Sequence, residues 1–444
     1  MATQELLPLR RKTSECDVPA NRFEGDLFQR SKLAEQLTSF LHRLPDGAVI
    51  AIDSQWGEGK TWFGRRWNAS LEDAGFQTAY IDCFQRDHLD DPFTMIAGEL
   101  IALATASKPE IQTKLLTAGK KLGAALLPAA TKFTINTIGH WAIGNAALSD
   151  SLTKGLESLE ASAGDALEKL VAKRLAEYQE GNASVDGFKA ALTEMAVEGE
   201  KPVVIFLDEL DRCRPDFAVR TIERVKHFFD VPGVIFVLLI NRRQLEAAVE
   251  GLYGPKVDAN AYLAKFIPIS LTLPKMTSVE SHGDDDNRRH CKSELKRLGF
   301  SETNPNDGFA SMLGILATLF NFSLRDVERS VMLYSFAQPL NSLSPASAWP
   351  IAIKLHKPNL YRSLCNHNPV AHIEAAKLAT QLRTAAPDAD WLLSFFEAMH
   401  QSAASGFKSA LPEDARATLM SMGSWSSAKS FMTVIFRRMD LTVE

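Results

Sequence analysis

The chain has 444 residues and a formal net charge of −5 at neutral pH. A chain of this length is expected to form two or three domains rather than one small core. Hydrophobic residues make up 45% of the chain and charged residues 23%, which is close to the average of globular proteins and argues against a disordered or fibrous chain. The acidic balance gives no global attraction to DNA or RNA, although it is compatible with a local basic patch.

Cysteine usage and the N-terminus bear on the cellular compartment. The five cysteines are scattered, and no two of them have the C-x-x-C spacing. This pattern predicts neither a disulfide framework nor a zinc site, and it fits a reducing compartment. Three basic residues at 10–12 are not followed by an apolar segment, so we expect no signal peptide and a cytoplasmic protein.

The first part of the chain alternates between helix and strand patterns. Residues 1–24 are expected to form a loose N-terminal arm, and apolar residues recur at helical spacing over 27–44. The runs "AVIAID" at 48–53 and "TAYID" at 78–82 predict buried strands. An amphipathic helix is predicted over 90–103.

Residues 104–200 have a different composition, rich in Ala, Leu, Gly, Lys and Glu, and predict a helical insertion. The most apolar stretch of the chain lies within it, at 122–148, and is interrupted by Lys132 and His140. Because no uncharged run of 18 residues occurs there, a clean transmembrane helix is not supported. We expect core helices, while contact with a membrane, such as peripheral attachment to the inner membrane, is an alternative that the sequence does not favour.

Strand patterns return at 203. Buried strands are predicted over 203–208 and 231–241, with a helix at 215–229 between them. The segment 266–274 alternates and contains Pro268, which favours an edge strand. This order of elements predicts an α/β fold with a parallel sheet and covering helices.

The remainder of the chain is expected to be mainly helical. Residues 281–292 mix charges and predict a solvated connector. The pattern of 293–444 is helical, and the Ser- and Pro-containing segment 341–350 is a plausible boundary within it.

One segment has the spacing of a phosphate-binding loop. "SQWGEGKT", residues 54–61, matches G-x-x-x-x-G-K-[ST] except that Ser54 replaces the first glycine. Gly57 and Gly59 supply the unusual dihedrals that turn N–H groups toward phosphate. Lys60 is expected to reach the β and γ phosphates and Thr61 to ligate Mg²⁺. The alternative is a chance Gly-Lys-Thr at a strand-to-helix turn. The full set of expected nucleotide contacts is Ser54, Trp56, Gly57, Glu58, Gly59, Lys60, Thr61 and Trp62.

A second cluster ends the strand at 203–208. A phosphate-loop enzyme needs a carboxylate at the end of a neighbouring strand, and Asp208 has that place and is expected to hold Mg²⁺ through water. Glu209 is the candidate general base for the attacking water. Asn241 ends the next buried strand and is a candidate for sensing the γ phosphate or orienting water. The alternative is that the acids are solvated and that Asn241 simply caps its strand.

Taken together, these motifs resemble the KAP family of P-loop NTPases. The resemblance rests on "WGEGKT" at 56–61, beside W-G-x-G-K-T, on "DELDR" at 208–212, beside D-[DE]-L-D-R, and on the sensor strand "VIFVLLINRRQL" at 234–245. Weaker similarity extends it over roughly residues 25–335, through the segments 26–37, 79–93, 261–274 and 323–331.

The resemblance implies Mg²⁺-dependent ATP hydrolysis coupled to a conformational change, and a helical insertion that often spans the membrane in the family. This chain departs from the family at Asn241, where an acid is common, and in its interrupted apolar stretch. We therefore predict an NTPase domain in two parts, 25–103 and 201–280, separated by the helical insertion at 104–200. A helical sensor region at 281–340 and a C-terminal helical region at 341–444 follow.

Arginines are candidates for stabilising charge on the γ phosphate. Arg325, in the helical part after the sheet, is the first candidate, and Arg212 is the second. Each has a neighbouring acid, Asp326 or Asp211, that would otherwise pair with it. Arg30 is a candidate for a place near the base or the phosphates.

Two functions remain open. The first is an ATPase that drives a structural switch, with anti-phage defence implied by bacterial family members. The second is a nucleotide-binding scaffold with little turnover, as implied by animal members that act as membrane scaffolds. A DNA-handling NTPase is disfavoured by the acidic charge. Homo-oligomers or protein partners fit either function, and the sequence does not separate ATP from GTP.

Overall fold

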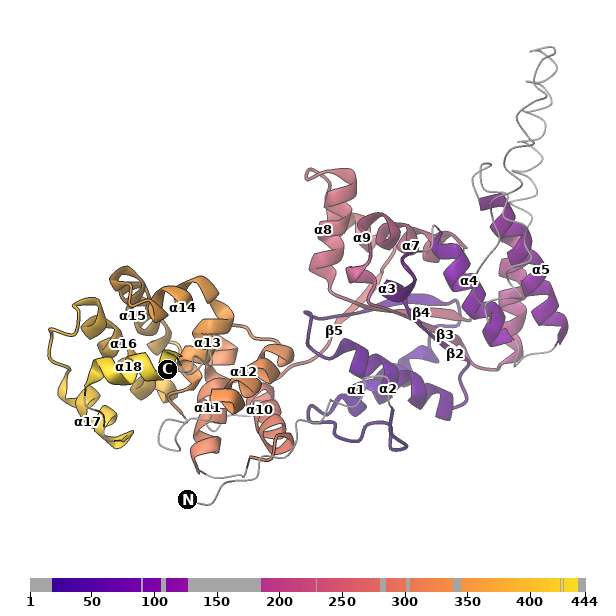
Figure 1. Ribbon diagram of the computed structural model, residues 1–444. Coiled ribbons are helices and arrows are strands. Elements are labelled where there is room, and N and C mark those ends of the chain that lie inside the picture. The colour runs from indigo at the N-terminus through magenta and orange to yellow at the C-terminus, as the bar shows by residue number, and fades with distance from the viewer. Residues whose placement is uncertain are drawn as a thin grey trace, which may run out of the picture.

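The computed structural model describes residues 18–88, 91–104, 109–126, 185–228, 230–279, 285–300, 304–337, 345–423, 425 and 427–437. These residues form two lobes (Figure 1). One lobe contains the sheet and helices α1 to α9, and the other contains helices α10 to α18. The polypeptide passes from the first lobe to the second after the last strand, β5.

In the described part of the chain, five parallel strands form one sheet in the order β2-β3-β4-β1-β5. The central strands β3 and β4 are buried along their whole length, as expected of continuous apolar runs in a sheet that is covered on both faces. The short strand β5 lies at an edge and begins after Pro268, which confirms the predicted edge strand. The strand bounds are β1 Ala48–Asp53, β2 Thr78–Asp82, β3 Val203–Asp208, β4 Val234–Ile240 and β5 Ile269–Thr272.

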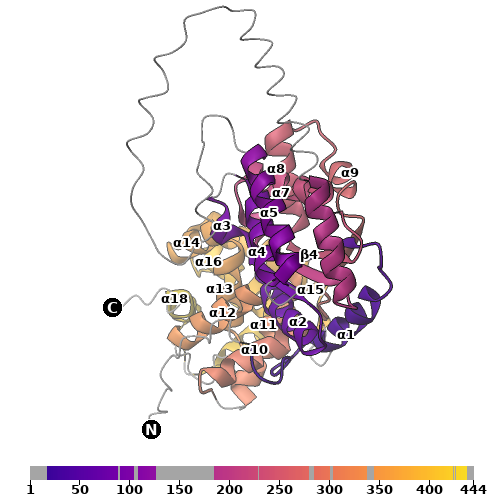
Figure 2. The same cartoon turned by 90° about the vertical axis from the view of Figure 1, so that its right-hand side faces the viewer.

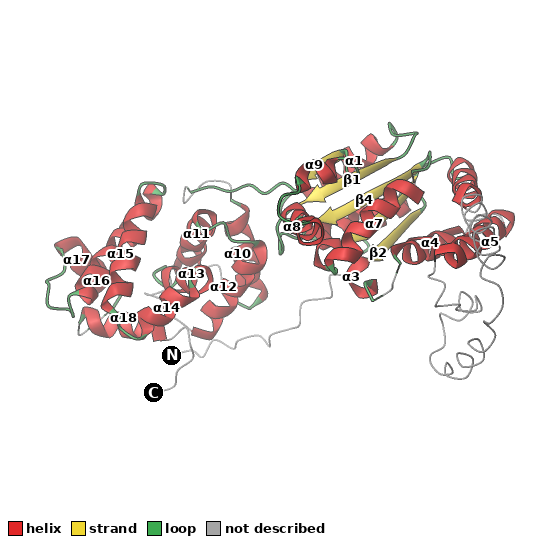
Figure 3. Cartoon of the chain, turned by 90° about the horizontal axis from the view of Figure 1, so that it is seen from above, coloured by secondary structure: helices red, strands yellow, loops and turns green. Residues whose placement is uncertain are grey.

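Helices cover both faces of the sheet (Figure 3). On one face lie α1 (Arg30–Leu41) and α2 (Lys60–Asp73), and Phe63 and Trp67 of α2 share an apolar core with side chains such as Phe206. The other face forms a second apolar core with α4, α5, α7, α8 and α9. This arrangement confirms the predicted α/β fold. The bounds of the remaining helices of this lobe are α3 Cys83–Arg86, α4 Pro92–Leu103, α5 Pro109–Leu126, α7 Pro215–Phe228, α8 Arg242–Tyr253 and α9 Ala259–Ala264, with the short 3₁₀ helix η2 at Leu210–Arg212.

The spatial order of the strands differs from the sequence-based expectation in one respect. We expected the strand of Asp208 to lie beside the strand that leads into the phosphate loop, but β4 separates β3 from β1. Chain order does not fix spatial order in a parallel sheet, and β4, which is buried along its whole length, takes the central place here. Consequently Asn241, directly after β4, lies between the ends of β1 and β3.

Two described helices belong to the predicted insertion. Helix α5 and the helix over 185–198 pack onto the sheet lobe through residues such as Leu115 and Phe188. Helices α4 and α5 lie side by side in two perpendicular views (Figure 1, Figure 2). Within the described residues, no helix has the length and apolar character that crossing a membrane requires. Most of the apolar stretch at 122–148, from residue 127 onward, lies outside the described residues.

The second lobe is helical and has its own apolar core. Large buried side chains such as Trp349, Tyr361 and Phe396 come together in it from helices that are distant in the sequence. The helix bounds are α10 Asp286–Arg297, α11 Asn304–Leu319, α12 Leu324–Ala337, α13 Ala348–His356, α14 Pro358–Cys365, α15 Pro369–Arg383, α16 Asp390–Ala404, α17 Glu413–Ser421 and α18 Ala428–Arg437, with the 3₁₀ helix η4 at Pro387–Ala389.

Candidate functional site

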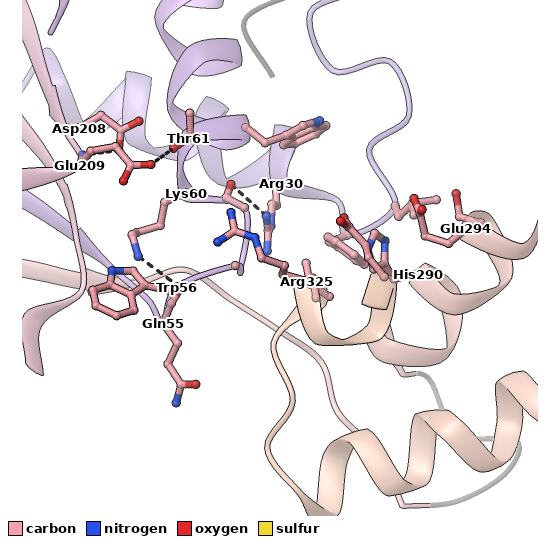
Figure 4. Close-up of a pocket in the computed structure, with 18 of the residues that line it drawn as sticks. Arg30, Gln55, Trp56, Lys60, Thr61, Asp208, Glu209, His290, Glu294 and Arg325 are labelled. Atoms are coloured by element: carbon pink, nitrogen blue, oxygen red, sulfur yellow. Dashed lines mark hydrogen bonds and ion pairs between the residues drawn. The ribbon is translucent and has the colours of Figure 1, made fainter. Parts of the chain in front are cut away.

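A cavity lies between the phosphate loop and the first helices of the second lobe (Figure 4). One end is lined by the loop, the start of α2 and the acidic segment after β3. The other end is lined by the segment before α1 and by α10 and α12. The lining residues of the first end include Gln55, Trp56, Gly57, Gly59, Lys60, Thr61, Trp62, Asp208, Glu209, Asp211 and Arg212. Those of the second end are Leu27, Phe28, Arg30, His290, Ser293, Glu294, Leu324, Arg325 and Glu328.

Two glycines shape the loop for a physical reason. Gly57 and Gly59 have φ values of 84° and 79°, in the left-handed region that disfavours other residues. A Cβ atom on Gly57 would lie 2.7 Å from Cβ of Arg325, and one on Gly59 would lie 2.7 Å from Nη1 of Arg30. The loop therefore needs glycine both for its turn and for the close approach of neighbouring side chains.

Lys60 is buried at the first turn of α2, and its ammonium group bonds to the loop itself. Its Nζ donates to the carbonyl oxygens of Ser54, at 2.5 Å, and Gln55, at 3.3 Å. Burial lowers the pKa of Lys60, and the nearby charges of Asp211 and Asp208 oppose that effect. Neutral carbonyl groups thus hold a cation that an anionic ligand would attract more strongly.

The start of α2 meets the acidic segment at the same place (Figure 4). Oγ1 of Thr61 lies 3.5 Å from Oε1 of Glu209. The Asp208 carboxylate accepts hydrogen bonds from the Tyr80 hydroxyl, at 2.7 Å, and from the backbone N–H of Glu209, at 2.8 Å. A hydroxyl and a carboxylate are oxygen donors of the type that Mg²⁺ prefers, so these residues fit such an ion.

Burial raises the pKa of both acids. The pKa of Asp208 is raised because the carboxylate is desolvated, although its hydrogen bonds lower the pKa in part. Desolvation and the adjacent Asp208 charge raise the pKa of Glu209 to about 7. A carboxylate with a pKa near neutrality is suited to accept a proton from water at physiological pH.

Arg212 lies on the same short segment and pairs with Glu209. Its Nε lies 2.5 Å from Oε2 of Glu209, so the ion pair differs from the predicted pairing with Asp211. Asp211 instead accepts a hydrogen bond from Nε1 of Trp56. Glu209 itself has a left-handed backbone with φ of 60°, which ends the extended conformation of strand β3 and leads into η2.

Arg325 lines the cavity from the helical lobe. Its backbone N–H donates to the carbonyl oxygen of Gly57 at 3.2 Å, which fixes the start of α12 directly against the loop. Asp326, the neighbour expected to pair with Arg325, bonds instead to Ser323 and Arg329. Among the described residues, the guanidinium of Arg325 has no ion-pair partner.

Three of the predicted contacts do not line this cavity: Ser54, Glu58 and Asn241. Ser54 contributes its carbonyl to Lys60. The buried carboxylate of Glu58 forms an ion pair with Lys275 at 3.0 Å, and Lys275 also donates to the carbonyl oxygen of Phe322. The side chain of Glu58 thus joins the loop to the helical lobe. Asn241 is buried at the end of β4.

The far end of the cavity contains residues that the sequence did not single out. His290 and Glu294 are one turn apart on α10, and Nε2 of His290 lies 3.3 Å from Oε1 of Glu328 on α12. Arg30, which is also a candidate, reaches the phosphate loop, because its Nη1 donates to the carbonyl oxygen of Gly59 at 3.4 Å. Its guanidinium lies over the ring of Phe28, and burial lowers its pKa to about 10.

Helix α10 also corrects an expectation for residues 281–292. We predicted a solvated connector there, but from Asp286 onward the segment is helical and buries several polar residues. Asp285 caps the helix by accepting from the N–H of Asn287 at 2.9 Å, and Asp286 accepts from the N–H of Met276 at 2.8 Å. Hydrogen bonds of this kind allow charged residues to be buried, so charge alone did not indicate exposure.

A parallel sheet whose first strand leads through a Gly-Lys-Thr loop into a helix is the arrangement of P-loop proteins. The family model described as the KAP family P-loop domain matches residues 30–339, so the chain belongs to the KAP family of P-loop NTPases. No match was found among curated protein sequences.

Two solved structures show similarity over most of the chain at low identity. An Aeropyrum pernix ORC2 protein, solved as ADPNP-ADP complexes, is 11% identical, with 96% of this chain and 95% of that chain covered and a TM-score of 0.34. CDC6P from Pyrobaculum aerophilum is 13% identical, with 96% of each chain covered and a TM-score of 0.37. Scores of this size are too low for any argument about function.

Proposed function

We propose that this protein binds a Mg²⁺-nucleoside triphosphate, with ATP as the expected nucleotide, and hydrolyses it. The observation that carries the proposal is the meeting of Lys60 and Thr61 with Asp208 and Glu209 at one end of a single cavity, although about 150 residues of sequence separate the two pairs. Membership of the KAP family supports the same conclusion.

Each residue has a role that follows from its chemistry. The loop N–H groups and Lys60 bind the phosphate oxygens. Thr61 and Asp208 are the candidates to hold Mg²⁺, which would supply positive charge to the phosphates and the leaving oxygen. Glu209 orients the attacking water and accepts its proton, which its raised pKa favours. Before it can do so, Glu209 has to exchange its contact with Arg212 for one with water.

Direct contacts between the loop and the helical lobe give this reaction a route to a conformational change. The loop is tied to α12 by the hydrogen bond from Arg325 to Gly57, and it is tied to the segment before α10 by the ion pair of Glu58 with Lys275. A phosphate group that rearranges the loop would therefore displace the lobe. We propose that turnover switches the orientation of the two lobes, and a role in anti-phage defence stays a hypothesis from the family resemblance.

The variant Glu209→Gln tests the proposal. Turnover is expected to fall by about two orders of magnitude or more, because the general base is lost. The variant should still bind ATP and retain it for longer than the wild type does, as measured by filter binding after a chase with unlabelled ATP. The matched control is Glu246→Gln on α8, since Glu246 also pairs with an arginine, Arg242, at 3.1 Å, but does not line the cavity.

The same measurements separate the two hypotheses that the sequence left open. If the wild type binds ATP without turnover, and Glu209→Gln changes neither binding nor retention, the protein is a nucleotide-binding scaffold. If the wild type binds no nucleotide with Mg²⁺ present, the proposed site itself is wrong.

A further inference from the structure

The hydroxyl group of Tyr80 contacts the proposed metal site from the neighbouring strand. In the pairing of β2 with β3, Tyr80 lies opposite Phe206, and the two rings stack with centroids 5.7 Å apart. Asp208 lies two residues beyond Phe206, on the same face of the sheet. The long side chain of Tyr80 reaches along this face, and its hydroxyl donates to Oδ2 of Asp208 at 2.7 Å.

Packing around Tyr80 holds this hydroxyl in place. The guanidinium of Arg65 lies over the Tyr80 ring, 4.6 Å from its centroid. On α2, a Cβ atom at Gly64 would lie 3.2 Å from the Tyr80 hydroxyl oxygen and 2.2 Å from Cδ1 of Leu239. Glycine inside a helix costs about 1 kcal/mol relative to alanine. The close approach that Gly64 permits to the Tyr80 hydroxyl and Leu239 gives a physical reason for that cost.

The two oxygens of Asp208 are fixed by two different donors. Oδ2 accepts from the Tyr80 hydroxyl, and Oδ1 accepts from the backbone N–H of Glu209 at 2.8 Å. A carboxylate has about four lone-pair sites, so two bonds set its orientation and leave capacity for a cation. Ligands of metal ions are commonly held in this way by a second hydrogen-bonded group.

We propose that Tyr80 is a positioning residue for Mg²⁺ binding, which orients the Asp208 carboxylate toward the ion beside Thr61. This inference rests on the proposed function, because it concerns the same site. It adds a residue that does not line the cavity and that lies outside both the phosphate loop and the acidic segment after β3. A purely structural role for the hydroxyl would change stability without changing the response to Mg²⁺.

The test measures nucleotide binding rather than turnover. A fluorescent ATP analogue is titrated in EDTA and then at increasing Mg²⁺ concentration, for the wild type and for Tyr80→Phe, which keeps the ring and its stacking. We expect Tyr80→Phe to bind the analogue in EDTA as the wild type does. The Mg²⁺ concentration that produces half of the metal-dependent gain in affinity should rise about tenfold.

Two further variants make the result specific. Tyr262→Phe is the matched control, because the Tyr262 hydroxyl also donates to a carboxylate, Glu223, at 2.5 Å, but lies outside the cavity. It should leave the Mg²⁺ titration unchanged. In the background of Asp208→Asn, Tyr80→Phe should have no additional effect on the titration, since the two side chains act as one unit.

Each outcome decides between the two proposals. If the wild type shows no Mg²⁺-dependent gain in affinity, the proposed metal site fails and the role of Tyr80 fails with it. If the wild type shows the gain and Tyr80→Phe titrates in the same way, only the role of Tyr80 is overturned. A lower thermal stability of Tyr80→Phe with an unchanged Mg²⁺ midpoint would also overturn it, because the hydroxyl would then act on folding alone.

Discussion

The two lobes bury polar groups in different ways. In the sheet lobe, Lys60 and Asp208 are buried beside a cavity. Lys60 donates to loop carbonyl groups, and Asp208 accepts from the Tyr80 hydroxyl. In the helical lobe, Trp349, His372 and His400 are enclosed in the apolar core and bond to one another. A ligand can replace partners at a cavity, whereas enclosed groups exchange partners only if the lobe opens. Burial of a polar group thus points to function only where space for a ligand adjoins it.

The hydrogen-bonded series Trp349–His400–His372 in the helical lobe has a defined arrangement of protons. Nε1 of Trp349 donates to Nε2 of His400 at 3.1 Å, so this nitrogen is an acceptor. The other nitrogen of His400 then carries a hydrogen and donates to Nδ1 of His372 at 2.9 Å. Burial lowers the pKa of both histidines, and His372 has a pKa of about 4. Both histidines of this hydrogen-bonded group are therefore neutral in the folded state at physiological pH.

The largest expected effect is at the cavity. Lys60→Ala should reduce turnover about a thousandfold, because it removes the cation that binds the phosphates during transfer. Thermal stability should not fall, since the variant no longer buries a charge. Initial rates and thermal unfolding measure both effects. Lys114→Ala, on the exposed surface of α5, is the control, and equal losses in the two variants would argue against a specific role for Lys60.

A variant in the hydrogen-bonded series Trp349–His400–His372 is expected to affect stability alone. His400→Leu leaves the N–H of Trp349 and the acceptor nitrogen of His372 without partners, which should lower the free energy of unfolding by about 3 kcal/mol. Denaturant titration measures this loss, and ATP affinity should be unchanged under native conditions. A variant of native stability, or one with altered ATP affinity, would break the contrast between the lobes.

Arg325 belongs to the helical lobe but lines the cavity, so it tests whether a residue of the helical lobe contributes to turnover. Arg325→Gln should slow turnover about tenfold or somewhat more, because one charge-assisted contact to the γ phosphate is lost. Arg329→Gln, one turn further along α12 and exposed, should turn over like the wild type. If the two variants behave alike, the helical lobe contributes no charge to the reaction.

The sequence predicted the sheet well because its strands are unusually clear. The runs at 48–53, 78–82 and 203–208 are continuous or nearly so in apolar residues, and the structure has strands with the same bounds. The position of β4 between β1 and β3 was not predictable, because chain order does not fix spatial order in a sheet. The first part of the helix at 286–297 was missed because Asp286 is buried by a hydrogen bond from the N–H of Met276, which lies outside the segment.

The candidate site was predicted in part for a similar reason. A loop motif with fixed spacing can be recognised in a sequence, and so can a pair of acids after a buried strand. Tyr80 gave no signal, since tyrosine on a strand is ordinary and its bond to Asp208 joins residues far apart in the chain. The histidine pair was equally hidden, because its members are 28 positions apart in the sequence.

The smallest expected effect is the dependence of the helical lobe on pH. His372 has an ordinary pKa of 6.5 when unfolded and about 4 when folded. Between these values the unfolded chain binds a proton that the folded chain does not, so stability is complete above pH 6.5 and falls as the pH falls. The slope contributed by this group is at most about 1.4 kcal/mol per pH unit.

Denaturant titrations of the wild type and of His372→Asn, each at several pH values between 7.5 and 4.5, isolate this slope. The variant should be less stable at pH 7.5, because His400 loses its acceptor, but its stability should fall less steeply with acid. A steep loss in both proteins would assign the acid sensitivity to other groups. A shallow slope in both would mean that the histidine pair takes up its proton without unfolding of the lobe. The pair would then not be enclosed, and in this respect the helical lobe would not differ from the cavity.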